Sequence, residues 1–209
     1  MYKYMIKIGH IINPFKCDKE NSSYLYYAQP ITFKSMLIAK RRAQRNKNLK
    51  VNLFSINYPE DDVIVPNFFT KLPHLKRSSK DLYDCKKKLP FLQDIFNSIL
   101  KHSNCDFIIF TNSDISVKPN FYEKVYQIIK KEGRLSFTIN RRDNIPKFYK
   151  GKRLTSNDLN IINQFKGELH PGNDCFIIHR HLLKKLNLIN LFIGYPPWGT
   201  ILVLLLKKF

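Results

Sequence analysis

The sequence predicts an α/β protein, built as a single three-layer domain with a mainly parallel central sheet. Strand-like and helix-like segments alternate along the chain, which is typical of a parallel sheet covered by helices. The length of 209 residues corresponds to one domain. Hydrophobic residues make up 44% of the chain and aromatic residues 13%, enough for a sizeable core. We therefore expect residues 1–209 to form one domain.

The first half of the chain is expected to contain two strands and one helix. Residues 5–12 alternate loosely between apolar and polar side chains and end at Asn13-Pro14. Thr32 is a suitable N-cap for a helix, because Phe33, Met36 and Leu37 follow on one face. The predicted elements are a strand at 5–12, a helix at 32–44, a strand at 50–56 and an irregular, basic excursion at 63–88.

The second half repeats the alternation more clearly. Leu92, Ile95, Phe96 and Ile99 recur at helical spacing. A later helix is expected to begin with a capping box of Asn120 and Glu123 and to stop at Gly133. The predicted elements are helices at 89–102, 120–133, 155–165 and 180–188, and strands at 106–111, 135–140 and 174–179.

The chain is strongly basic, with 36 Lys and Arg against 16 Asp and Glu and a formal net charge of +20. A field of this size attracts polyanions such as nucleotide phosphates, nucleic acid and anionic lipid. The lysines are dispersed, which favours a general compositional bias over a single binding surface. Both interpretations stay open at this stage, and peripheral contact with an anionic membrane is one consequence of the charge.

The cysteines and the apolar segments indicate the cellular compartment to expect. Cys17, Cys85, Cys105 and Cys175 are widely separated and form no CxxC pair, so a zinc ribbon is excluded and reduced thiols are expected. The first residues lack the long apolar core of a signal peptide, and no apolar run is long enough to span a bilayer. We expect a cytoplasmic protein, with membrane association left open.

Polar side chains follow four of the predicted strands at the points where those strands end. They are Asn13, Asp61 with Asp62, Asn112 with Asp114, and Arg141 with Arg142. In open α/β sheets, ligands bind just beyond the carboxyl ends of the strands. These side chains are therefore the candidates for a binding site.

Asp114 is the most informative of them. It follows the apolar strand "DFIIFT" but precedes the next helix, whose cap is expected at Asn120. A local turn held by the aspartate side chain is one interpretation. The other is a hard oxygen ligand for a divalent cation that holds a diphosphate, because a bare carboxylate would repel phosphate.

The stretch "DFIIFTNSDISVKPNFY" resembles the strand, acidic motif and helix of GT-A-type glycosyltransferases. "INPF", "INYPEDD", "LHPGNDCFIIHRHLL" and "FIGYPPWG" resemble further segments of that fold in the same order. The resemblance implies a GT-A-like (Rossmann-like) domain that moves a hexosyl or related group from a nucleotide-sugar donor to a glycan or other hydroxyl acceptor. It also implies Mn²⁺ or Mg²⁺ as cofactor, with Asp114 as the metal ligand.

The resemblance assigns roles to individual residues. Asp114 and Asp174 are the expected catalytic residues, and Asp174 would be the general base of an inverting transfer. The expected donor-binding residues are Asn13, Asp61, Asn112, Arg141 and Arg142. Adjacent residues on an extended segment point to opposite sides, so only one of the two arginines is expected to face the cleft.

His170 and Trp198 are the expected acceptor-binding residues. His170, His179 or His181 could supply a third metal ligand, although a histidine satisfied within the fold or exposed on its surface is the commoner case. Trp198 could stack on a sugar ring or pack in the core. A turn aspartate after Pro171-Gly172 is the plain alternative for Asp174.

The sequence departs from the family pattern in two places. The first aspartate of the usual acidic motif is Asn112 here, which is a weaker metal ligand than a carboxylate. Gly199-Thr200 follow the tryptophan where related proteins often carry an acid, and the chain ends soon afterwards. A truncated or degenerate enzyme therefore stays open, as does a non-catalytic relative. A basic nucleic-acid-binding protein is the third alternative, but no nucleic-acid-binding motif supports it, so nucleic acid is not an expected partner.

Overall fold

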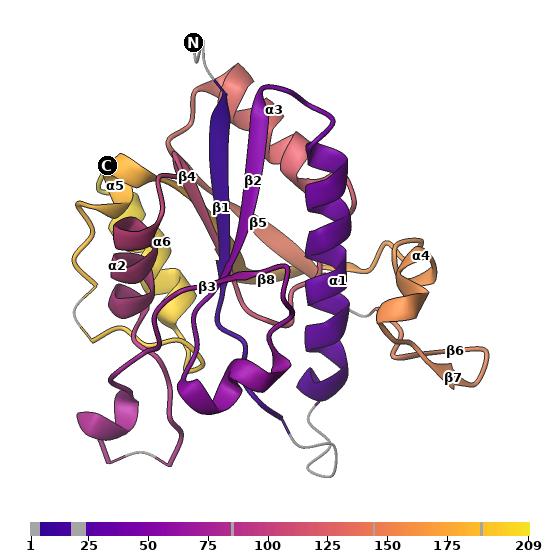
Figure 1. The fold of residues 1–209 in the computed structure, drawn as a ribbon, viewed down its shortest axis with the longest axis horizontal. Coiled ribbons are helices and arrows are strands. Elements are labelled where there is room, and N and C mark those ends of the chain that lie inside the picture. Colours follow the sequence, from indigo (N-terminus) through magenta and orange to yellow (C-terminus); the bar gives the residue numbers. More distant parts are fainter. Residues whose placement is uncertain (1–4, 18–23, 85, 144, 189) are drawn as a thin grey trace.

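A computed structural model describes residues 5–17, 24–84, 86–143, 145–188 and 190–209. A six-stranded sheet in the order β3-β2-β1-β4-β8-β5 lies between two layers of helices (Figure 1). The strands are β1 Ile6–Ile12, β2 Leu49–Ser55, β3 Thr70–Lys71, β4 Phe107–Thr111, β5 Ser136–Asp143 and β8 Glu168–His179. A separate hairpin pairs β6 Phe148–Tyr149 with β7 Lys152–Arg153.

The helices are α1 Leu25–Ala43, α2 Leu92–His102, α3 Phe121–Glu132, α4 Leu159–Ile162, α5 Arg180–Leu183 and α6 Trp198–Leu206. Short 3₁₀ helices cover Pro59–Ile64, Ser79–Asp81 and Ser156–Asp158. Over the described ranges, none of the helices combines the length and apolarity of a bilayer-crossing segment.

The sheet is mainly parallel, as predicted. β1 pairs in parallel with β2 and β4, and β2 with β3. β8 is antiparallel to both β4 and β5, so β5 runs in the same direction as β4. The carboxyl ends of β1, β2, β4 and β5 therefore lie along the same edge. The predicted α/β class with a GT-A-like architecture is confirmed.

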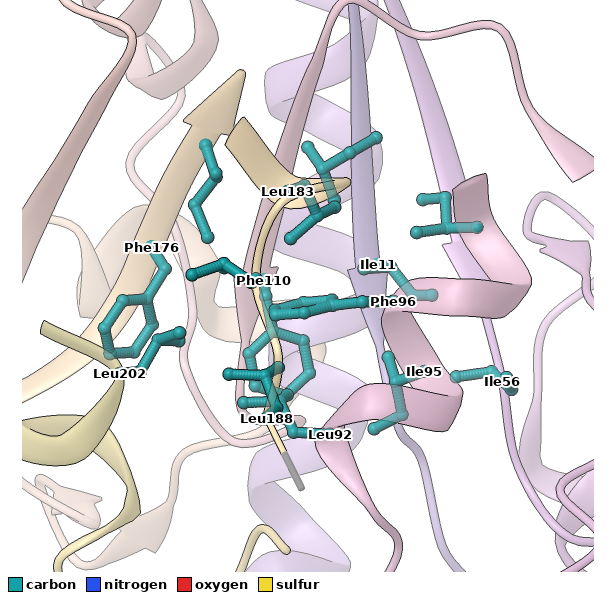
Figure 2. Packing of buried hydrophobic residues seen from close by; sticks show 14 of the residues in the cluster. Ile11, Ile56, Leu92, Ile95, Phe96, Phe110, Phe176, Leu183, Leu188 and Leu202 are labelled. Carbon is teal, nitrogen blue, oxygen red and sulfur yellow. The ribbon is translucent and has the colours of Figure 1, made fainter. Parts of the chain in front are cut away.

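Alternating side chains of the strands pack into two separate hydrophobic cores, one on each face of the sheet. On one face, strand residues pack with α2, α5 and α6, and Figure 2 shows Phe96 beside Phe110 and Leu202 beside Phe176 within this cluster. On the other face, apolar strand residues pack with buried residues of α1 and α3. The period-2 alternation of a strand allows both faces to be apolar only when both are covered, which is what the central strands show.

Several predicted boundaries are wrong. α1 begins at Leu25 and runs through Pro30, so Thr32 lies buried inside the helix and caps nothing. Asn120 forms no side-chain cap bond, and Glu123 pairs with Arg42 at 2.7 Å instead, so the predicted capping box is absent. Gly133 does end α3 in a left-handed conformation, as predicted. The helix expected at 155–165 is reduced to a 3₁₀ turn and α4.

The strands β5 and β8 are longer than predicted. Pairing between them continues through Arg142 opposite Leu169 and Asp143 opposite Glu168. Arg141, Arg142 and His170 therefore belong to strands, although the sequence predicted none there, and Asp174, predicted as the first residue of a strand, lies within β8. The extended part of β8 runs past Thr111, the last residue of β4, and so overhangs the edge where the polar residues gather.

Candidate active site

Asn13 and Asp61 lie buried behind the ends of β1 and β2. The Asn13 side-chain amide donates to the Ile56 carbonyl at 2.7 Å. The Lys16 amide donates to an Asp61 carboxylate oxygen at 2.7 Å. Burial raises the pKa of Asp61, and the bond from Lys16 partly offsets this effect. Both side chains thus hold the turns that follow their strands.

Asp114 lies in the turn after β4, and Asn112 begins that turn by accepting the Ile115 amide through its backbone carbonyl at 3.3 Å. The Tyr24 hydroxyl, at the start of α1, donates to an Asp114 carboxylate oxygen. Burial and this contact with Asp114 raise the pKa of Tyr24, so the phenol stays protonated and remains a donor. Through Tyr24, the start of α1 contributes a side chain to the site. The sequence alone did not identify Tyr24 as a candidate.

Arg141 joins the side chains of β5 and β8. Its guanidinium donates to Asp143 and to Asp174, each at 2.8 Å, and lies 3.1 Å from His170 Nε2. Burial raises the pKa of Asp174, the positive charge of Arg141 lowers it in part, and the charge of Asp114 raises it further. Asp114, Arg141 and Asp174 therefore share one electrostatic environment.

The other predicted residues lie differently. Arg142 turns away from this cluster, and its guanidinium donates to the Gly167 carbonyl at 3.2 Å. Its direction agrees with the expectation that only one of the two arginines faces the cleft. Trp198 is buried, with its ring centroid 5.8 Å from that of Phe110 and 5.5 Å from that of Phe176. Both neighbours are core residues, so Trp198 packs in the core. We therefore do not propose that it stacks on a sugar ring.

Of the three histidines near Asp174 in sequence, only His170 is near it in space. His170 Nδ1 accepts the Gly172 amide at 2.9 Å and lies 3.8 Å from an Asp174 carboxylate oxygen. His179 pairs with Phe107 at the opposite end of β8, and His181 follows it in α5. These two lie away from the site, because His179 is at the far end of β8 and five positions along an extended strand span roughly 16 Å.

The buried side chain of His10 stabilises the strand end that leads to Asp114. His10 in β1 contacts the Tyr122 hydroxyl at 2.8 Å and the Thr111 hydroxyl at 2.9 Å. Burial lowers the pKa of His10 to about 3, so the ring is neutral. Thr111 directly precedes the Asn112-Ser113-Asp114 turn, so this network fixes the end of the strand that carries Asp114.

The described residues test whether a divalent cation fits. They contain no group of three or more His, Cys, Asp or Glu side chains arranged around a common point. A magnesium site needs less when the substrate contributes, because one or two carboxylates then complete the shell with phosphate oxygens and water. Asp114 can supply one such carboxylate once the Tyr24 hydroxyl shares or leaves it. The residues fit a cation held jointly with a bound diphosphate.

Residues 87–186, just under half of the chain, match the family model "Glycosyl transferase family 2". This segment contains Asp114, Arg141 and Asp174. The resemblance to GT-A-type glycosyltransferases is thereby confirmed. Over just under half of the chain, this protein is therefore similar to family 2 glycosyltransferases.

Solved structures give two further likenesses to this glycosyltransferase-like chain. One is TarS of S. aureus, residues 1–349 in complex with UDP-GlcNAc, with 13% identity, a TM-score of 0.46, and coverage of 86% of this chain and 47% of that one. The other is HddC from Yersinia pseudotuberculosis, with 10% identity, a TM-score of 0.38, and coverage of 93% and 82%. The chain thus spans about half the length of the TarS chain. Among curated protein sequences, none matches this chain.

Proposed function

We propose that this chain is a glycosyltransferase that moves a sugar from a nucleoside-diphosphate sugar to an acceptor hydroxyl, with Mn²⁺ or Mg²⁺ assisting. The observation that carries the proposal is the convergence of Asp114, Arg141 and Asp174 at the carboxyl edge of the sheet, within the segment that matches the family. That edge is where open α/β sheets bind their ligands.

The donor is proposed to bind with its diphosphate between Asp114 and Arg141. Asp114, with Asn112 beside it, would hold the divalent cation, which when bound neutralises the charge that develops on the departing diphosphate. Arg141 can exchange one of its carboxylate partners for a phosphate oxygen, because its guanidinium carries several donors in a fixed plane. Asn13 and Asp61 keep the neighbouring turns in place for the nucleoside.

Asp174 is proposed as the general base that takes the proton of the acceptor hydroxyl. Its carboxylate is buried and oriented by Arg141 at 2.8 Å, so it is held in one direction. Burial raises the pKa of Asp174 toward the pH at which a carboxylate is an effective base. His170 lies on the same side and is proposed to contact the acceptor.

Donor binding tests the proposal. We expect UDP- or GDP-sugars to raise the melting temperature in the presence of Mn²⁺, because a ligand that binds only the folded state stabilises it by mass action. Asp114→Ala should abolish this shift, and a chelator should do the same. The matched control is Asp84→Ala, which removes one exposed carboxylate in the excursion before α2.

Two outcomes would contradict the proposal. Nucleotide binding that is unaffected by both the chelator and Asp114→Ala would remove the metal role of Asp114. A folded protein without affinity for any nucleoside diphosphate would indicate a non-catalytic relative of the fold. Release of free sugar from the donor in the presence of metal would rule that relative out.

A further inference from the structure

The hairpin of β6 and β7 is the most basic and aromatic short segment of the described chain. Residues 147–153 read "KFYKGKR", with four cations, two aromatic rings and no acid. Lys150 and Gly151 connect the strands with φ of 48° and 75°, the left-handed pair of a tight two-residue turn. Figure 1 shows the hairpin projecting from the molecule beside α4. The projection exposes both rings, Phe148 at 52% and Tyr149 at 39%.

Cations of this hairpin lie over aromatic rings. The Arg153 guanidinium lies 4.1 Å from the ring centre of Tyr27 and 4.6 Å from that of Phe148. Lys150 lies 5.6 Å from the ring centre of Tyr149. Such contacts keep a cation ordered while its charge remains available to an anion.

Other basic positions have close acidic partners, and two of them that also lie over rings, Arg77 over Phe91 and Lys88 over Tyr58, lie over buried rings. Arg42 pairs with Glu123, and Arg77 with Asp94, each at 2.7 Å. Within the hairpin, Lys152 lies 3.8 Å from an Asp158 carboxylate oxygen, and the Lys152 side chain is 76% exposed. Dispersed lysines explain a basic surface in general, but they do not explain cations stacked on exposed rings.

The hairpin is connected to the proposed active site by one side chain. Lys147 lies 5.7 Å from the ring centre of Tyr24, and the hydroxyl of Tyr24 donates to Asp114. The base of the hairpin is fixed, because the Leu154 amide donates to the Lys147 carbonyl at 2.9 Å and Leu154 is buried. A molecule bound to the hairpin therefore lies beside the proposed donor site.

A groove of about 620 Å³ adjoins the same surface. Its walls are mostly apolar and include Tyr26, Tyr27, Phe33, Phe68, Thr155 and Ser156. Tyr27 is shared by the groove and by the stack with Arg153. The surface thus offers aromatic faces in a groove and cations at its border, a combination that suits a chain of sugar rings carrying negative charge.

Building on the glycosyltransferase function proposed above, we propose that the β6–β7 hairpin binds the acceptor and that the acceptor is an anionic carbohydrate. Phe148 and Tyr149 contact the apolar faces of the sugar rings. Lys147, Lys150 and Lys152 bind the phosphate or carboxylate groups. Only the Tyr24 side chain separates Lys147 from Asp114. An acceptor hydroxyl next to the bound anionic group can therefore reach the donor.

Removing two charges at the tip of the hairpin tests this inference. The variant is Lys150→Asn with Lys152→Gln, because asparagine suits the left-handed conformation at position 150 better than lysine does. The matched control is Lys124→Gln with Lys131→Gln, which removes the same charge from exposed positions of α3. Calorimetric titration at fixed salt measures binding of oligogalacturonate, inorganic polyphosphate and neutral dextran.

We expect the unmodified protein to bind oligogalacturonate at least about tenfold more tightly than dextran, because only the former offers charge to the hairpin lysines. The hairpin variant should lose about fivefold or more in affinity for both anions, while the control variant stays within about twofold. Phe148→Ser should weaken oligogalacturonate binding and leave polyphosphate binding unchanged, because only the former has sugar rings.

Equal losses in the hairpin and control variants would overturn the inference, as would equal affinity for dextran. Tighter hairpin-dependent binding of a single-stranded oligonucleotide or of phosphatidylserine vesicles would show that the partner belongs to another class. Donor binding is measured separately by thermal shift. If donors bind and anionic glycans do not, this inference fails alone, and in the reverse case the proposed donor function fails alone.

Discussion

Among single residues, Asp174 and Arg141 show both what the sequence could predict and what it could not. Arg141 was a candidate because it follows a predicted strand, and Asp174 because its segment resembles that of GT-A-type glycosyltransferases. Their contact depends on the pairing of β5 with β8, and the register of two strands that are separated by a helix is not encoded in local sequence. The pair, and with it the orientation of the proposed base, therefore needed the structure.

The effect of the Arg141 charge on the pKa of Asp174 should be measurable. Burial raises the pKa of Asp174 and Arg141 lowers it in part, so we expect Arg141→Gln to raise that pKa further. The carboxylate would then protonate at a higher pH, and the acid limb of any transfer rate would move upward by the same amount. NMR titration of the ¹³C-labelled aspartate carboxyl carbons measures the midpoint directly.

Arg142→Gln is the control for this titration, because its guanidinium donates to the Gly167 carbonyl and forms no ion pair with any carboxylate that the structure describes. It should leave the midpoint of Asp174 unchanged. An unchanged or lowered midpoint in Arg141→Gln would show that Arg141 does not stabilise the ionised form of Asp174.

Tyr24 and His10 are the residues that sequence reasoning missed. Tyr24 follows a polar stretch that predicted a loop, and nothing local indicates that its hydroxyl reaches Asp114. His10 sits within an apolar strand, where a histidine is most simply a satisfied core residue, and its contacts with Tyr122 and Thr111 are of that kind. These contacts join residues 90 or more positions apart in the sequence. Periodic patterns describe only residues within one element, so they could not predict them.

At the scale of elements, the existence and order of the main helices and strands followed from hydrophobic periodicity, while their ends did not. β5 and β8 extend through polar residues because each supplies the other with backbone hydrogen bonds, whatever the side chains are. α1 extends toward its N-terminus through Pro30 because tertiary burial of Phe33, Met36 and Ala39 outweighs one lost backbone bond.

The packing of α6 on β8 gives a prediction at this scale. A Cβ atom added at Gly199 would lie 2.5 Å from the Asn173 carbonyl oxygen, closer than such atoms approach. Because that contact is with backbone, Gly199→Ala should push α6 away from the strand. We expect the free energy of unfolding to fall by roughly 1–3 kcal/mol, as in other overpacked sites, measured by urea denaturation.

Thr200→Ala is the control, since Thr200 is exposed and is the next residue of the same helix. It should change the free energy of unfolding by less than about 0.5 kcal/mol. A Gly199→Ala variant as stable as the unmodified protein would mean that α6 does not press on β8 as the structure has it. Because Asn173 precedes Asp174, the proposed general base, the same substitution should also slow transfer to the acceptor hydroxyl.

For the whole molecule, the net charge of +20 opposes folding as well as attracting anions. Apart from the pair of Arg141 with Asp174, most ion pairs among the described residues involve exposed side chains. In the pair of Lys88 with Glu60, for example, the side chains are 42% and 54% exposed. Pairs of that exposure contribute little to stability, so repulsion among the lysines should outweigh them. The sequence predicted this excess of charge fully, because it depends on composition and not on the fold.

Salt should therefore stabilise the protein. Raising NaCl from about 50 to about 500 mM shortens the screening length and weakens repulsion between lysines that are not in contact. We expect the melting temperature to rise, and to rise less in a variant with several exposed lysines outside the hairpin replaced by glutamine. A falling melting temperature would show that the ion pairs dominate. Because chloride screens every lysine alike, this effect should persist when Lys150 and Lys152 are replaced, whereas binding of an anionic glycan should not.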